Sequence, residues 1–221
     1  MNNWIKAGIA ASAALATIFF MSKRGSSKSA FAPQPVPRCT EQLALHHGGT
    51  RSLSNLNLIV LHSTEGDDAA GAAGWWQDPK SGGSAHIVVD DRNCIRAVPD
   101  NVWPWGAMGG TANERGLHIE IAGHANYDPK TGAKAYTRED WLSHMDRLKS
   151  AAAIVWDWGQ TYGIPMRFLD AEALKRGESG ITTHAEVTKA FRVDDHTDPG
   201  KAFPIDVFMD LVGGNAGGYV A

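Results

Sequence analysis

The chain has 221 residues, 43% hydrophobic and 20% charged, which is enough for one domain with a full apolar core. Residues 1–32 hold four basic residues and no acidic one, so the remainder has 17 basic against 24 acidic residues and a net charge of about −7. A body this acidic is a poor ligand for polyphosphates, and we expect no nucleic-acid partner.

An apolar segment begins the chain. Residues 7–21, AGIAASAALATIFFM, carry no charge, and counted from Trp4 the run just reaches the ~17 residues that a short membrane-spanning helix needs. We expect residues 1–23 to be a retained membrane anchor, with a cleaved signal peptide as the alternative. In either case the protein is anchored at a membrane or exported. The Ser/Pro-rich residues 24–38 predict an extended linker.

The folded domain is expected to span residues 39–212, followed by a Gly-rich, flexible tail at 213–221. Its two cysteines, Cys39 and Cys94, are too few for a disulfide framework. One bridge between them is possible if the protein is exported, and two free thiols are the alternative. The chain has no CxxC pair, so no zinc knuckle built from thiolates is expected.

Strand and helix patterns alternate through this domain. Residues 56–63, LNLIVLHS, form a near-continuous apolar run, typical of a buried strand, that ends at His62. A short helix is predicted over 67–77 and a hairpin over 84–98. Residues 116–123, GLHIEIAG, alternate between apolar and polar side chains, which predicts a strand with one polar face.

The strongest helix pattern covers residues 137–163. Thr137 is a suitable N-cap with Asp140 three residues later, and Gly163 ends the pattern. A last helix is predicted over 204–211. Together these elements predict a single α/β domain with a mixed central sheet flanked by helices, preceded by the N-terminal hydrophobic segment.

Three residues combine the chemistry of a metal site. His62 ends a buried strand, where α/β sheets build their sites, His184 starts another segment, and Asp198 lies in an Asp-Pro-Gly turn. Two imidazoles and one carboxylate are the ligand set of a catalytic zinc, with a fourth position for water. Three other histidines remain alternative ligands at this point: His86, His118 and His196. The remaining four are read as ordinary hydrogen-bonded residues: His46, His47, His124 and His144.

Four motifs carry a family resemblance. They are LIVLHSTEG, GSAHIVVDDRN, NERGLHIEIAG, and THAEV followed by HTDPGKAFP, in this order across about residues 54–212. In order and spacing they resemble the zinc-dependent N-acetylmuramoyl-L-alanine amidases, a superfamily that includes phage lysozyme-type amidases and peptidoglycan recognition proteins. The resemblance implies that His62, His184 and Asp198 bind Zn2+. It also implies a peptidoglycan substrate, cut between the lactyl group of N-acetylmuramic acid and L-alanine.

Two further residues are candidates for catalysis. Glu120 lies on the polar face of its strand, where the family carries a glutamate, and we expect it to move the proton from water to the leaving amine. His196 stands where the family usually has a lysine two residues before the last ligand. It either donates a hydrogen bond to the oxyanion or orients a ligand. The tyrosine of phage lysozyme-type members is Ala85 here, which places more of the mechanism on Glu120.

Three residues are expected at the substrate: His86, Trp105 and Thr64. For His86, a position behind the site or a purely structural role are the alternatives. The family's WHAG motif appears as Trp105-Gly106-Ala107, without its histidine, so substrate preference is expected to differ. We expect a monomeric, phage-type lysin that degrades the cell wall. A bacterial wall-remodelling amidase and a non-catalytic peptidoglycan-binding module are the alternatives, and a metalloprotease is disfavoured because HExxH is absent.

Overall fold

The computed structural model describes residues 31–107, 110–192 and 194–214. The predicted anchor or signal segment at 1–23, the first part of the linker and nearly all of the tail lie outside these residues. Within the described ranges, no helix is long and apolar enough to cross a bilayer. Residues 31–38 have no regular secondary structure, as expected for a linker. The domain boundaries at 39 and 212 stay predictions.

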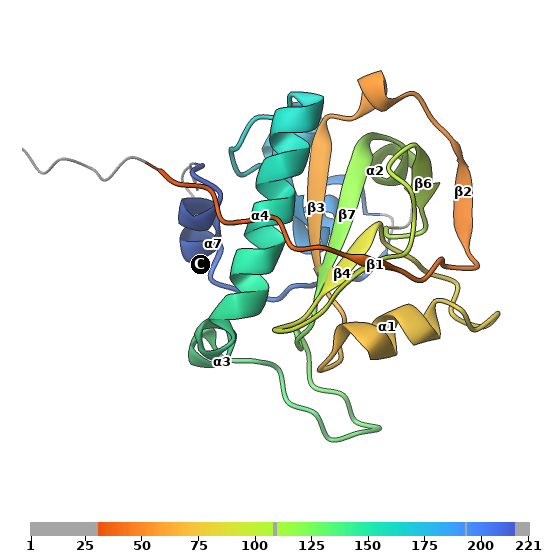
Figure 1. The fold of residues 1–221 in the computed structure, drawn as a ribbon, viewed down its shortest axis with the longest axis vertical. Coiled ribbons are helices and arrows are strands. Elements are labelled where there is room, and N and C mark those ends of the chain that lie inside the picture. Colours follow the sequence, from red (N-terminus) through yellow and green to blue (C-terminus); the bar gives the residue numbers. More distant parts are fainter. Residues whose placement is uncertain (1–30, 108–109, 193, 215–221) are drawn as a thin grey trace, which may run out of the picture. The chain divides into compact units, whose positions relative to one another are not determined.

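A six-stranded mixed sheet lies at the centre of the domain, in the order β1-β5-β4-β7-β3-β8 (Figure 1). Four neighbouring strands, β4, β7, β3 and β8, are parallel, and β5 is antiparallel to β4. The predicted mixed sheet is therefore confirmed. The strands are β1 (Thr40–Glu41), β3 (Leu58–Ser63), β4 (Ile87–Val89), β5 (Cys94–Arg96), β7 (Gly116–Ile121) and β8 (Gly180–Thr183). A separate antiparallel pair joins β2 (His47–Thr50) to β6 (Val102–Pro104).

Helices cover both faces of this sheet. The helices α4 and α7 pack with the largest apolar cluster on one face, and α2, α5 and α6 pack with a second cluster on the other. The helices are α1 (Ala69–Trp75), α2 (Gly110–Arg115), α3 (Arg138–Ser143), α4 (Met145–Tyr162), α5 (Ala171–Lys175), α6 (His184–Phe191) and α7 (Ile205–Leu211), with a 3-10 turn at Leu53–Asn55. Figure 1 shows α4 running along the sheet and a long loop projecting between β7 and α3.

The alternation of β3 and β7 decides which side chains reach the site. Ile59 and Leu61 of β3 pack in the α4 cluster, and Leu58 and Val60 pack in the opposite cluster. His62 points to the same face as Leu58 and Val60, because successive side chains of a strand point to opposite faces. The apolar residues of β7 all join the α4 cluster, so its polar residues share the face of His62. Each fully buried aliphatic side chain stabilises the fold by about 1.5–3 kcal/mol.

The predicted long helix is two helices. α3 and α4 are separated at His144, whose backbone leaves the helical region (φ −103°, ψ 47°), so the prediction of one continuous helix was wrong. The capping box of Thr137 and Asp140 and the end at Gly163 are confirmed. Instead of lying on a solvated helix face, His144 places its Nδ1 2.7 Å from Asp91 Oδ2.

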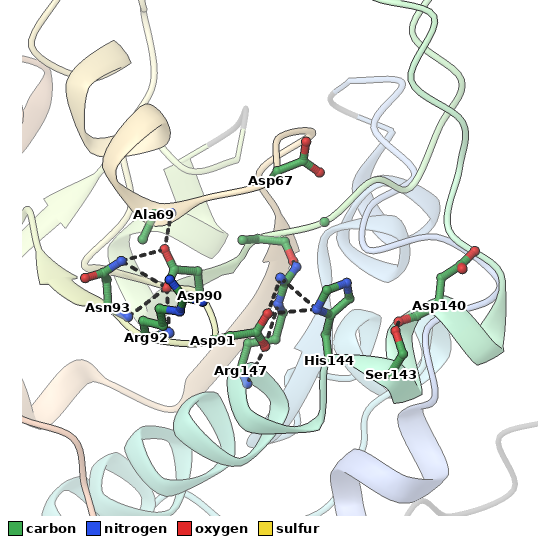
Figure 2. Close-up of polar contacts among 12 residues, drawn as sticks. Asp67, Ala69, Asp90, Asp91, Arg92, Asn93, Asp140, Ser143, His144 and Arg147 are labelled. Carbon is green, nitrogen blue, oxygen red and sulfur yellow. Dashed lines mark hydrogen bonds and ion pairs between the residues drawn. The ribbon is translucent and has the colours of Figure 1, made fainter.

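Asp91, His144 and Arg147 form a polar cluster, here called the Asp91 cluster (Figure 2). Arg147 Nη2 donates to Asp91 Oδ2 at 2.6 Å, and its Nη1 donates to the carbonyl of Ala122 at the end of β7. The neighbouring Asp90 accepts hydrogen bonds from backbone N–H groups of its own turn and of α1. The hydrogen bonds of the cluster therefore connect the β4–β5 hairpin to the start of α4.

Cys39 and Cys94 form a disulfide bond, with Cα atoms 4.4 Å apart. Of the two alternatives that the sequence left open, one bridge or two free thiols, the structure has the bridge. The bond joins the residue before β1 to the first residue of β5, and β1 is only two residues long. A bridge closing a loop of this length typically stabilises a domain by about 2–4 kcal/mol.

Candidate metal centre and active-site cleft

Three parallel strands converge on the site at their carboxyl ends. In the register of β3 with β7, His62 lies directly beside Glu120, so their side chains share one face. In the register of β3 with β8, Leu61 lies beside Thr183, the residue before His184. Carboxyl ends of parallel strands are where α/β folds place their sites, because the following loops and helices diverge there.

Asp198 reaches the same place from a loop. The Gly200 N–H donates to the Thr197 carbonyl at 3.0 Å, which closes the turn predicted around Asp198. The Ala185 N–H, in the first turn of α6, donates to the Asp198 carbonyl at 3.0 Å. These two bonds fix the carboxylate next to His184.

His62, His184 and Asp198 meet as one buried cluster. His62 Nδ1 lies 3.0 Å from Asp198 Oδ2, and His184 Nδ1 lies 3.1 Å from Asp198 Oδ1. The two Nδ1 atoms are 3.1 Å apart. All three residues are at most 5% exposed, and each offers one ligand atom to a common point. The structure therefore brings together the three residues that the motifs singled out.

The hydrogen bonds behind the two imidazoles test whether a metal fits. His62 Nε2 lies 2.9 Å from His118 Nδ1, and His184 Nε2 lies 2.9 Å from Asp194 Oδ2. When each Nε2 carries the proton of a neutral ring, both Nδ1 lone pairs point at each other and at a carboxylate. Lone pairs that converge in this way repel one another unless a cation lies between them. Two nitrogens and one carboxylate oxygen suit a divalent ion that accepts N and O ligands.

The electrostatics favour the metal-binding form of His62 and Asp198 but not of His184. Burial lowers the pKa of His62, which keeps that imidazole neutral. Burial alone would raise the pKa of Asp198, but hydrogen bonds from His184, His196 and His62 hold it well below its usual range. Burial likewise opposes charge on His184, yet its contacts with Asp198 and Asp194 raise its pKa. A metal bound here therefore competes with a proton at His184.

The sequence patterns did not predict a role for Asp194 at this site. It holds His184 Nε2, and Thr188 of α6 in turn donates to its Oδ1. Its side chain is only 3% exposed. The one sequence signal was an acidic pair, Asp194-Asp195, immediately before His196. Such a pair in a loop is usually solvated, and only the return of the loop over α6 buries Asp194.

Glu120 lies in the cleft beside the cluster with an unusual environment. Its Oε2 is inaccessible to solvent and has no hydrogen-bond partner among the described residues. Burial, and the nearby negative charges of Asp198 and Glu65, raise its pKa well above the usual value. A raised pKa makes a carboxyl group a stronger proton acceptor than an ordinary glutamate, as acid–base catalysis requires.

His196 contacts the cluster from the solvent side. Its ring stacks on that of His184 with centroids 4.5 Å apart, and its Nδ1 lies 3.5 Å from Asp198 Oδ1. Its side chain is 55% exposed and lines the cleft. His196 and His118 both lie outside the set of three converging ligands. The structure thus places His196 where it can contact either a substrate or Asp198.

With this geometry in place, comparison with known proteins identifies the family. Residues 52–201 match the family described as N-acetylmuramoyl-L-alanine amidase. The chain belongs to this family. The resemblance inferred from the four motifs is therefore confirmed, and the matched range contains every candidate site residue.

Individual relatives agree with this amidase family. N-acetylmuramoyl-L-alanine amidase XlyA of Bacillus subtilis is 28% identical over 160 residues, which cover 67% of this chain and 52% of XlyA. The chain thus spans about half the length of that curated relative. Among solved structures, Staphylococcus aureus AmiA in complex with its ligand aligns with a TM-score of 0.62 at 20% identity, covering 80% of this chain and 82% of AmiA. PlyL aligns at 0.51 and 17% identity, covering 83% and 100%. These structural matches show the fold.

The cleft of this amidase-family domain has a volume of about 660 Å³. Trp105 lies on its wall, 48% exposed, with its ring stacked on His46 at 5.1 Å. Thr64 also lines it, although its hydroxyl donates to the Gly66 carbonyl at 2.7 Å. Both residues therefore line the cleft, and their contact with substrate stays a prediction. Carboxylates dominate the charged groups of the lining, which includes Glu65, Asp128 and Asp195 and no lysine or arginine among the described residues.

His86 does not line this cleft. Its ring is fully buried, its Nδ1 accepts a hydrogen bond from the His118 N–H at 2.9 Å, and its Nε2 lies 3.1 Å from the Val102 carbonyl. The predicted contact between His86 and substrate is not supported, because the ring is fully buried and Arg51 Nη2 lies 2.7 Å from its Nε2. Of the alternatives, a position behind the site is the one that this geometry favours.

Proposed function

We propose that this chain is a zinc-dependent hydrolase that cuts the amide bond between N-acetylmuramic acid and L-alanine in peptidoglycan. The observation that carries the proposal is the buried oxygen of Glu120, which has no hydrogen-bond partner among the described residues. It lies beside the His62–His184–Asp198 cluster, within a domain of this family. An orphaned carboxyl oxygen next to converging metal ligands is what an enzyme needs for a water held between them. A binding module would gain nothing from that arrangement.

The zinc ligands would be His62 Nδ1, His184 Nδ1 and one oxygen of Asp198. Three protein ligands are typical of catalytic rather than structural zinc sites. Bound zinc lowers the pKa of water from 15.7 to about 7 and polarises a carbonyl group.

Glu120 moves the proton. As a carboxylate it accepts a proton from the attacking water, and as a carboxylic acid it donates that proton to the departing amine of L-alanine. Burial and the nearby carboxylates raise its pKa well above the usual value, which favours its service as proton acceptor and then donor. With Ala85 at the position of the phage-type tyrosine, Glu120 acts without a phenol beside it.

His196 donates a hydrogen bond to the oxyanion that forms when water adds to the substrate carbonyl. Its hydrogen bond with Asp198, and the charges of Asp194 and Asp195, raise its pKa and favour the donating form. Its position on the cleft side of His184 supports this role. Orientation of Asp198 is the alternative.

The cleft lined by Glu120, Trp105 and Thr64 accepts the glycan and the stem peptide, with Trp105 and Thr64 as contacts. An exposed indole such as Trp105 provides an apolar face for a sugar ring. The Cys39–Cys94 disulfide supports action outside the cytoplasm, in agreement with a lysin that reaches the cell wall. Anchoring or export through residues 1–23 and a monomeric state are parts of the same proposal.

Purified, zinc-loaded protein incubated with cell walls tests the function. We expect new L-alanine amino termini, and no release by the Glu120→Gln variant prepared in the same way. Wall binding without any new amino termini would replace the amidase with a binding module. Release that is equal in both preparations would show that the activity does not depend on this site.

A further inference from the structure

We propose that His118 is a positioning residue that selects the tautomer of His62 and so directs the His62 Nδ1 lone pair at the metal. This inference rests on the proposed zinc site. The two rings are stacked with centroids 5.1 Å apart, and His62 Nε2 lies 2.9 Å from His118 Nδ1. Nothing in the motif comparison assigns a role to this histidine.

A backbone carbonyl fixes the direction of the chain of hydrogen bonds. His118 Nε2 lies 3.1 Å from the carbonyl of Ala112 in α2, and a carbonyl only accepts. The His118 proton therefore resides on Nε2, and its Nδ1 is left as an acceptor. His62 must then donate from Nε2, which leaves its Nδ1 unprotonated and facing Asp198. In this way a carbonyl two hydrogen bonds away defines which nitrogen of His62 binds a cation.

The surroundings of His118 are shaped to hold this ring. A Cβ added at Gly106 would lie 2.4 Å from His118 Nδ1, and one at Gly116 would lie 3.0 Å from His118 Nε2. The first approach is closer than side chains allow. The second is tight, and the same Cβ at Gly116 would lie only 2.4 Å from the Ala112 carbonyl oxygen. Gly106 is also the position at which the family's WHAG motif has its histidine. A side chain at 106 and an imidazole at 118 therefore exclude each other, and in this chain the space beside His62 is filled from β7.

The backbone of His118 is fixed as well. Its N–H donates to His86 Nδ1 at 2.9 Å, and both rings are fully buried. Among the described residues, however, His86 makes no hydrogen bond to the His62–His184–Asp198 cluster, and its own Nε2 lies 2.7 Å from Arg51 Nη2 and 3.1 Å from the Val102 carbonyl. His86 is thus a matched control: it is equally buried and lies one step further from the ligand.

The test is the zinc affinity of the full-length protein, measured by competition with a chelator and without any peptidoglycan. His118→Leu removes the acceptor and should weaken zinc binding about 10–100-fold. His118→Asn has a side-chain oxygen near the position of Nδ1 and should recover most of that loss. The control His86→Leu should stay within a few-fold of the wild type, even if it lowers thermal stability.

Wild-type affinity in His118→Leu, or no recovery in His118→Asn, would overturn the role of His118 while leaving the zinc site intact. Failure of the wild type itself to bind zinc would instead overturn the proposed function. If His118→Leu does not fold, the imidazole ¹⁵N spectrum of the metal-free wild type decides. Protonation of His62 at Nε2 is expected, and protonation at Nδ1 would contradict the inference.

Discussion

Two carboxylates in this molecule, the buried Asp198 and the partly exposed Asp91, are surrounded by nitrogen, with different consequences. Asp198 is contacted by the imidazoles of His62, His184 and His196. Asp91 is contacted by the guanidinium of Arg147 and by the imidazole of His144. The contacts hold the pKa of each carboxyl below its usual range, against the opposing effect of burial. A lowered carboxyl pKa therefore does not by itself separate a site from a structural cluster.

Asp91 and Asp198 differ in the kind of nitrogen group that contacts them. Arg147 has only donors, so its N–H groups satisfy Asp91 and the Ala122 carbonyl completely within the protein. The imidazoles around Asp198 present nitrogen lone pairs once their outer nitrogens are hydrogen-bonded. The lone pairs of such a cluster are satisfied only when a cation lies between them. The comparison predicts that changes around Asp198 alter metal binding and chemistry, whereas changes around Asp91 alter stability alone.

The largest effect is expected from Asp198→Ala. This change removes the only anionic ligand and leaves two imidazole lone pairs facing each other, so zinc should fall well below one equivalent. Zinc content after dialysis is the measurement, and Asp91→Ala is the matched control that should keep its metal. Stoichiometric zinc in Asp198→Ala would remove Asp198 from the ligand set.

Glu120→Gln should separate chemistry from metal binding. The amide has nearly the same shape but cannot transfer a proton, so turnover should fall by about 10²–10⁴-fold while zinc content is unchanged. Turnover is measured as the rate at which L-alanine amino termini appear, and zinc content is measured by metal analysis. Near-normal turnover would move the proton transfer to another residue, with the cleft-lining His196 as the first candidate.

Asp194→Ala should weaken zinc binding about 10–100-fold, because His184 loses the carboxylate that holds its Nε2. The neighbouring Asp195→Ala is the control, since Asp195 is exposed, lines the cleft and makes no hydrogen bond to the three ligands among the described residues. Zinc affinity by chelator competition distinguishes the two. Equal affinities would show that His184 needs no carboxylate behind it.

Part of this site was predictable from local sequence patterns. Strand alternation placed His62 after a buried run and Glu120 on the polar face of β7, and the structure puts them side by side. The turn around Asp198 was predictable because Asp-Pro-Gly has a strong local preference. The substrate role of His86 was not supported, since nothing local distinguishes a polar face that meets solvent from one buried by another layer.

The unpredicted parts depend on contacts between segments distant in the chain. The break at His144 follows from Asp91, 53 residues earlier, while the local sequence has no Gly or Pro to mark it. Short elements such as β1 and α5 have too few residues for any periodicity. The same holds for Asp194, whose burial comes from its loop folding back on α6.

Asp91→Asn should give the smallest effect and complete the comparison. Loss of the charge weakens the hydrogen bonds from Arg147 and His144, and the free energy of unfolding should fall by about 1–3 kcal/mol, with zinc affinity unchanged.

The pH dependence of the stability difference between wild type and Asp91→Asn gives a second readout. Because folding lowers the pKa of Asp91 from its ordinary value of 3.8, its contribution is fully present above that value and is lost as pH falls through the folded pKa. Denaturant unfolding of both proteins should therefore show a constant difference at neutral pH that shrinks below about pH 4. A zinc affinity that falls together with stability in Asp91→Asn would contradict the division of roles between the two carboxylates.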